Sequence, residues 1–187
     1  TFYVEATDSR GALSRFPANA INVEIDGQRH ECIVRWGDPI PVSSFATYRL
    51  WLSRANVNSY INRPALSNQD IAGTMVVNNN RGIHNMFSHY SNSPYHQGQN
   101  GFPERGGQHY ERHLPVDDKY LGTENFNKVH APGNATFEDN NWIREQTAYW
   151  VARKMKLPYL YRRFVAMYLN GTRKSANSPG PDALTEP

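Results

Sequence analysis

The sequence predicts an α+β fold in which a mostly antiparallel sheet is combined with one main helix and is preceded by the end of a β-sandwich. Short stretches that alternate apolar and polar residues, separated by turn residues, recur through most of the chain. Residues 141–157 instead repeat apolar residues at helical spacing. The chain has 187 residues, 39% of them hydrophobic, which is enough for one domain or for one domain and part of another.

The first strands are expected as a hairpin over residues 1–17, which alternates on both sides of the turn Ser9-Arg10-Gly11. We interpret residues 1–22 as the C-terminal strands of a preceding β-sandwich domain. A second hairpin is expected over residues 22–36, with Asp26-Gly27 as its tight turn. The single cysteine, Cys32, follows this alternation and is expected to be a small buried residue without a disulfide partner in the chain.

The middle of the chain continues the sheet. A strand is expected over 45–53, followed by a short helix over 54–62 that ends before Pro64. The stretch 71–90, rich in β-branched and aromatic residues, predicts two strands joined at 78–82. A long polar loop then leads to a short strand over 109–114.

One helix is predicted with a clear start and end, over residues 141–157. Asp139 or Asn140 can cap it, and Pro158 ends it. Its apolar residues form one stripe, which consists of Ile143, Thr147, Trp150, Val151 and Met155.

An alternating strand, "YRRFVAMYL", follows the helix and leads into Asn170-Gly171, a strong signal for a hairpin turn. After Lys174 the sequence becomes rich in Ser, Asn, Gly and Pro. We therefore expect residues 175–187 to supply no strand and to form a disordered tail unrelated to the preceding domain, which spans residues 23–174.

Charge and hydropathy argue against two classes of partner. The net charge is only +3, and most basic residues are scattered rather than gathered in a stripe, so no nucleic-acid partner is expected. No apolar run approaches the length of about 18 residues that indicates a membrane span. Because Thr1 is not an initiator Met and already lies in a predicted strand, we interpret the chain as part of a longer precursor.

Seven histidines raise the question of a metal site, since several of them lie close in sequence. His84 and His89 are five positions apart, which on a regular strand would place them on opposite sides of the sheet. Nothing resembles the helical His-Glu-x-x-His motif of zinc hydrolases. The sequence therefore predicts no metal ligands, and a histidine-based metal hydrolase is kept as a third alternative.

The order of elements suggests the smaller lobe of a kinase-like fold, in which a mostly antiparallel sheet is followed by one helix and a hairpin. In such lobes a strand lysine pairs with a helix glutamate, so that the cation can hold nucleotide phosphates. Glu145 lies in the first turn of the predicted helix, where that glutamate would be. The alternative reading is a surface glutamate that compensates the helix dipole.

Several motifs in order resemble the CotH kinase family, named for a bacterial spore-coat protein. The main one is "IREQTAYWVARKMKLPYLYRRFVAMYLNG", and "YVEATDSRGALSRFPA", "TYRLWLSRANVNSY", "NMFSHYSNSPYH" and "LPVDDKYLGTENFNKVHAPGN" precede it. The resemblance covers almost all of residues 1–174. It implies an atypical protein kinase that uses ATP and Mg²⁺ to phosphorylate secreted or surface proteins. It also implies a large multidomain bacterial parent, which is secreted or held at the cell surface.

The resemblance also implies a nucleotide-binding set, with departures from the family pattern. Ser93 lies in the segment that matches a glycine-led turn, here replaced by "SNSP". The strand expected over 109–114 lacks the lysine of the family pattern. Arg112 is then the nearest cation that could pair with Glu145, and Lys128 is a second candidate. Arginine holds phosphate well but does not replace lysine in every role.

The family continues beyond the Asn-Gly turn with a glycine, a strand and later the metal-binding carboxylates, which this chain does not match. The chain is therefore expected to be catalytically incomplete without the remainder of its parent, and no catalytic residue is assigned. The alternative is a non-catalytic extracellular or surface binding module, with Trp36, Trp51, Tyr90 and Tyr95 available to stack on glycans or proteins.

Overall fold

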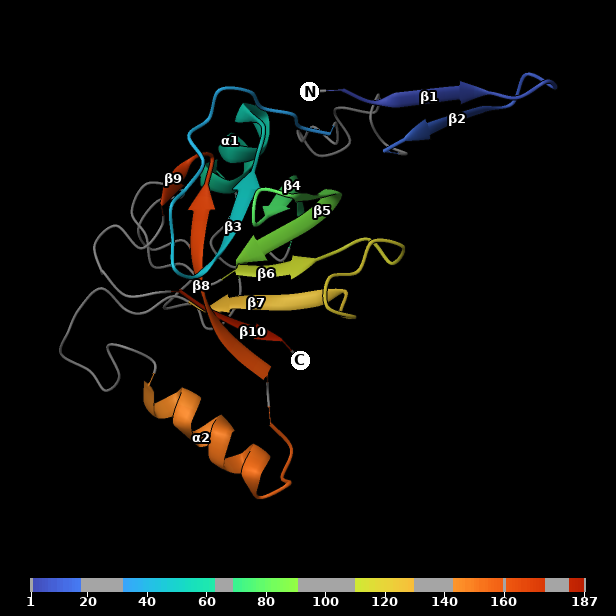
Figure 1. The fold of residues 1–187 in the computed structure, drawn as a ribbon. Helices are drawn as coiled ribbons and strands as arrows, with labels where there is room; N and C mark the ends of the chain where they lie inside the picture. The colour runs from blue at the N-terminus through green and yellow to red at the C-terminus, as the bar shows by residue number, and fades with distance from the viewer. Residues whose placement is uncertain are drawn as a thin grey trace.

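The computed structural model describes residues 2–17, 32–62, 69–90, 110–129, 143–159, 161–173 and 182–186. In this part of the chain, one large sheet is accompanied by a separate two-stranded hairpin and two helices (Figure 1). Most of the strand pairs are antiparallel. The coarse α+β class expected from the sequence is therefore confirmed.

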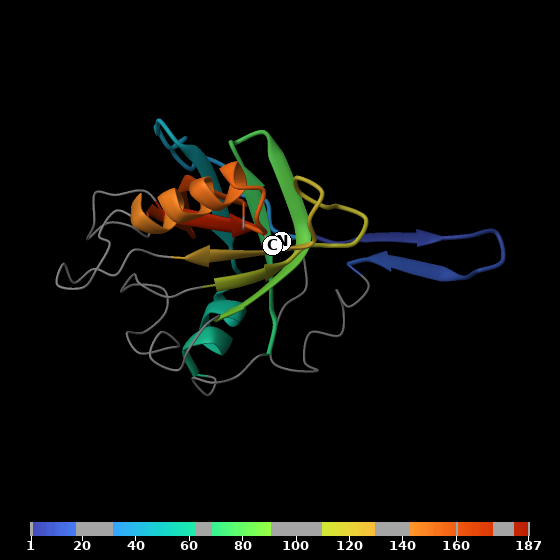
Figure 2. The ribbon, with the colours of Figure 1, turned by 90° about the horizontal axis from the view of Figure 1, so that it is seen from below.

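The hairpin is formed by β1 (Val4–Thr7) and β2 (Leu13–Phe16). Its turn is where the sequence places it: the Asp8 carboxylate accepts hydrogen bonds from the backbone N–H groups of Arg10 and Ala12, each at 2.8 Å. The hairpin extends away from the large sheet in both ribbon views (Figures 1 and 2). Because it forms no second layer on that sheet, the β-sandwich interpretation of residues 1–22 stays a prediction.

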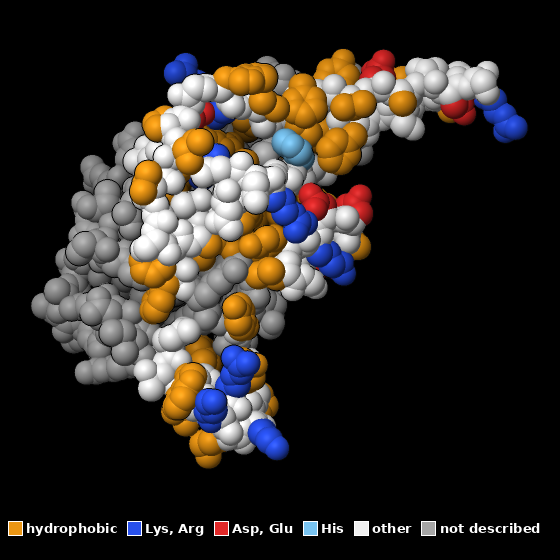
Figure 3. Space-filling model, viewed as in Figure 1, with side chains coloured by type: hydrophobic (Ala, Val, Ile, Leu, Met, Phe, Trp, Pro, Cys, Tyr) orange, Lys and Arg blue, Asp and Glu red, His pale blue; other side chains and the backbone are white. Residues whose placement is uncertain are grey.

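Apolar side chains of this hairpin lie at the surface, and Figure 3 shows them along it and near its base. Val4 is 53% exposed and Leu13 is 47% exposed. The second expected hairpin, over 22–36, lies largely outside the described residues. Its last part contributes only an isolated bridge between Cys32 and Phe2. Cys32 is buried as expected, and burial raises the pKa of its thiol.

The large sheet closes on itself. Its strand order is β10-β7-β6-β5-β4-β3-β8-β9, and β10 also pairs with β8. Within this sheet β3 and β8 run parallel. The strands are β3 (Ala46–Trp51), β4 (Ile71–Val77), β5 (Arg81–Tyr90), β6 (Tyr110–His113), β7 (Asn125–Val129), β8 (Tyr161–Leu169), β9 (Thr172–Arg173) and β10 (Asp182–Glu186).

Two of these strands were not expected. The sequence assigns residues 125–129 to no element, because "NFNKV" has no regular alternation and contains Asn and Lys, which are uncommon in strands. Asp182–Glu186 falls in the segment 175–187 that was predicted to be a disordered tail, yet it pairs with β7 and β8. Residues 175–181 are rich in Pro and Gly, which disfavour strands, and the prediction treated residues 182–186 in the same way although they contain neither.

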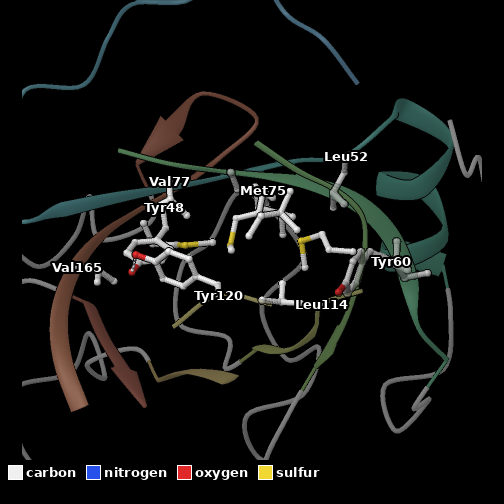
Figure 4. Packing of buried hydrophobic residues seen from close by; sticks show 14 residues of the cluster. Tyr48, Leu52, Tyr60, Met75, Val77, Leu114, Tyr120 and Val165 are labelled. Carbon is white, nitrogen blue, oxygen red and sulfur yellow. Dashed lines mark hydrogen bonds between the residues drawn. The ribbon is translucent and has the colours of Figure 1, made fainter. Parts of the chain in front are cut away.

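The core fills the inside of the closed sheet. Large side chains from β3, β4, β5 and β8 meet there, as Figure 4 shows. The helix α1 (Arg54–Asn62) packs against β4 and sends Tyr60 into this cluster. The hydroxyl of Tyr60 lies 2.6 Å from that of the buried Ser88. The largest fully buried side chains of the core are Tyr48, Leu50, Tyr60, Ile71, Met75, Ile83 and Met86.

Two asparagines in left-handed conformation hold the ends of β3. Asn78, with φ of 48°, accepts a hydrogen bond from the Thr47 N–H on its side-chain oxygen at 2.9 Å. Asn170, with φ of 46°, accepts one from the Leu52 N–H at 2.8 Å. Gly171 follows with φ of 85°, so the Asn170-Gly171 turn predicted from the sequence is confirmed.

The main helix, α2 (Ile143–Lys154), is shorter than the predicted 141–157 but matches its centre. Among the described elements it contacts only β8. Its expected apolar stripe is not buried: Trp150 is 58% exposed and Met155 is 64% exposed. The described part of the chain thus contains no element that covers this side of α2.

Candidate functional site

The best-defined cluster of reactive side chains consists of Asp70, His89 and His113. Asp70 directly precedes β4, His89 lies near the end of β5, and His113 ends β6. These strands are neighbours in the sheet. Residues next to these three, such as Ile71 and Ser88, are fully buried in the core. Since side chains alternate along a strand, the cluster lies on the outer side of the closed sheet.

The two imidazoles share one carboxylate. His89 Nδ1 lies 2.9 Å from Asp70 Oδ1, and His113 Nδ1 lies 3.1 Å from Asp70 Oδ2. The two rings are also in edge-to-face contact, with centroids 5.2 Å apart. Each carboxylate oxygen therefore faces a different histidine, which fixes how both rings are oriented.

The cluster is partly accessible to solvent. The side chain of His89 is 12% exposed, whereas those of His113 and Asp70 are 34% and 38% exposed. Burial by itself would raise the pKa of Asp70, but the hydrogen bond from His89 and the charge and hydrogen bond of His113 outweigh it. The pKa of Asp70 is therefore lowered, and the carboxylate is ionised at neutral pH.

The predicted orientation of the histidines is wrong because the strand is irregular. The register between β4 and β5 shifts between Gly73 and Met75, so that β5 contains one extra residue in this region. A bulge of this kind reverses the alternation beyond it. His84 and His89 therefore lie on the same outer side of the sheet.

The histidines were visible in the sequence, but their carboxylate partner was not. Asp70 is separated from His113 by 43 positions, and neither residue belongs to a local motif. The available signal was indirect: Asp70 and His89 lie at the two open ends of the predicted β4–β5 hairpin, where a hairpin brings residues together.

A second feature is a hollow of about 360 Å³ on the outer side of β3, β4 and β5, which residues 33–40 help to line. Arg35 stacks on Trp51 at 4.4 Å from the ring centroid and pairs with Asp38 through two bonds of 2.8 and 2.9 Å. Arg49 also faces Trp51, and its buried Nε has no hydrogen-bond partner. A buried guanidinium nitrogen of this kind can bind an anionic group.

The structure describes some, but not all, of the nucleotide-binding residues expected from the resemblance. Ser93 lies outside the described residues. Arg112 lies in β6 opposite Ser88 and Phe126, and Lys128 lies in β7 opposite Tyr110. This register puts the two basic residues at diagonal positions on the same face of neighbouring strands.

Glu145, the helix residue of the expected nucleotide-binding set, lies on an element that, within the described part of the chain, does not contact the strands of the two basic residues. Glu145 belongs to α2, which contacts β8 and, among the described elements, neither β6 nor β7. Of the aromatic residues considered for stacking, Trp36 is 86% exposed, whereas Trp51 is buried and is in contact with Arg35 and Arg49. The side chain of Tyr90 and all of Tyr95 lie outside the described part of the chain.

Comparison with protein-family models and with curated proteins gives no match for this chain. Neither helix of the described part has the length and apolar character needed to cross a bilayer.

Proposed function

We propose that this chain is the N-terminal part of a CotH-like kinase domain and that it does not transfer phosphate without the rest of its parent. The proposed parent uses ATP and Mg²⁺ to phosphorylate secreted or surface proteins of a bacterium. The order of the family-like motifs supports this proposal. So does the exposed apolar stripe of α2, because such a stripe in an intact domain packs against further structure.

The proposal also depends on the two candidate cations of the sheet. Phosphoryl transfer depends on positively charged groups placed next to one another around the phosphates. Arg112 and Lys128 occupy diagonal positions on adjacent strands, on the face of the sheet that also carries Ser88, so a shared anionic ligand would have to reach that face. Glu145 would orient one of them only after a rearrangement that brings α2 towards β6 and β7.

Calorimetry on the intact parent tests the proposal. Titration with ATP and Mg²⁺ should give a saturable heat with the parent, and Arg112→Ala and Lys128→Ala should each weaken it about tenfold or more. Arg15→Ala in the β1–β2 hairpin is the matched control, since it removes an exposed arginine far from both strands. A parent that binds no nucleotide, or whose affinity depends equally on all three residues, contradicts the proposal.

The second candidate is a non-catalytic surface binding module, and one specific observation favours it. The hollow beside Trp51 contains an Arg49 Nε that is buried without a partner. A site of this composition suits a small anion or an acidic group on a larger partner. Under this alternative, ATP and Mg²⁺ give no heat with the intact parent, and Arg49→Met abolishes binding of the surface ligand while Arg15→Met does not.

A further inference from the structure

We propose that Asp70, His89 and His113 together bind one divalent transition-metal ion, with zinc as the best-fitting ion. This inference concerns a different set of residues from the proposed nucleotide site and does not depend on it. Two imidazoles and one carboxylate are a ligand set that zinc, cobalt and nickel accept, whereas magnesium prefers oxygen ligands alone.

The distances between the ligand atoms fit such an ion. One ligand atom from each residue can be chosen so that all three lie within 4.8 Å of one another. The two nitrogen–oxygen distances are 2.9 and 3.1 Å. A zinc ion with bonds of about 2.0–2.2 Å holds tetrahedral ligands roughly 3.3–3.5 Å apart, so small side-chain movements would admit it.

The strands that carry the ligands hold them in place. His89 and His113 lie on adjacent strands whose pairing is continuous from Phe87–His113 to Tyr90–Tyr110. Asp70 is joined directly to Ile71, which pairs with Ser88 on β5. Because ordered sheet rather than loop positions both histidines, the site needs little reorganisation to bind a metal.

The site also has the charge and access that a bound ion requires. The carboxylate, which contacts both imidazoles, offsets one of the two positive charges of the ion. The partial exposure of Asp70 and His113 allows a water molecule to complete the coordination. Three protein ligands and one water are typical of zinc sites that act on substrates rather than only stabilise a fold.

Binding also has a defined proton balance. In the metal-free protein, each imidazole can donate its Nδ1 proton to Asp70. A metal bound through these nitrogens requires each neutral ring to carry its single proton on Nε2 instead, so binding changes the tautomer of both rings without a net release of protons.

Titration of the chain with Co²⁺ at pH 7.5 tests the proposal, since cobalt substitutes for zinc and absorbs visible light. We expect saturation at one ion per chain and competition by Zn²⁺. His89→Ala, His113→Ala and Asp70→Asn should each lower the affinity about tenfold or more. His84→Ala is the matched control: His84 lies on the same strand and the same side, contacts Thr74 at 3.4 Å, and should leave the affinity unchanged.

A measurement on the unaltered protein covers the case in which a variant does not fold. Co²⁺ is paramagnetic and should shift or broaden the ring signals of His89 and His113 in NMR spectra, with much smaller effects on His84. Absence of saturable binding overturns the proposal. So does binding that perturbs other histidines first, or binding that His84→Ala weakens as much as His89→Ala does.

Discussion

Replacing Asn170 by glycine tests whether one side chain holds the end of β3 to the β8–β9 turn. The Asn170 side-chain oxygen accepts the Leu52 N–H at 2.8 Å, and its own N–H donates to Leu50 O at 2.9 Å. Leu52 is 6% exposed, so its N–H would be left without a partner in a largely buried place. Leaving such a donor unsatisfied costs about 1–3 kcal/mol of unfolding free energy.

The control separates this hydrogen bond from the effect of adding a glycine. Asn79 also has positive φ, at 60°, but its side chain is exposed. Asn79→Gly therefore introduces the same freedom in the unfolded chain without removing a bond to β3. Asn170→Ala should be destabilising by about 1 kcal/mol more than Asn170→Gly, because a Cβ is unfavourable in the left-handed region.

Urea denaturation of the intact chain, followed by tryptophan fluorescence, measures these differences, since Trp51 is buried next to this turn. The reasoning is refuted if Asn170→Gly is no more destabilising than Asn79→Gly. It is refuted in its second part if Asn170→Ala and Asn170→Gly have equal stability.

Three further outcomes are expected from the same denaturation assay. The pKa of Asp70 is lowered in the folded state, so its ionisation stabilises the fold above the unfolded pKa of about 3.9, and this contribution is lost as the pH falls through the folded pKa. Asp70→Asn should therefore make the unfolding free energy less dependent on pH in this acidic range. An unchanged pH dependence would count against the shared carboxylate. Met75→Ala should lower the unfolding free energy by about 2–5 kcal/mol, since Met75 is fully buried, and a loss below about 1 kcal/mol would show that the core closes around the gap. Gly73→Ala should lower the unfolding free energy by about 1–3 kcal/mol, because a Cβ there would lie 2.8 Å from Leu52 Cδ2 and 3.1 Å from the Trp51 carbonyl oxygen. An unfolding free energy equal to that of the unaltered chain would contradict this packing.

Local patterns predicted the elements that local interactions determine. The helix Arg54–Asn62, the β4–β5 hairpin and the Asn170-Gly171 turn were each expected where they occur. In each case, alternation, helical spacing or a residue that tolerates positive φ is present within a few positions. The strand β7 carries little of this signal, and it was not predicted.

Long-range pairing could not be predicted in the same way. Nothing local indicates that Asp182–Glu186 lies between β7 and β8, since that register depends on residues far apart in the chain. The Asp70–His89–His113 cluster has the same origin. Its members were separately visible as polar residues, but their convergence depends on a bulge in β5 and on the order of three strands.

Closure of the large sheet has a consequence for contacts between chains. Every strand of the closed ring, β3, β4, β5, β6, β7, β10 and β8, has a paired neighbour on both sides. Unpaired strand edges are where other chains add and where aggregation begins, so the ring resists such addition. In the described part of the chain, edges remain on β9 and on the β1–β2 hairpin. The exposed apolar side chains of that hairpin make it the place most open to strand addition by a second molecule.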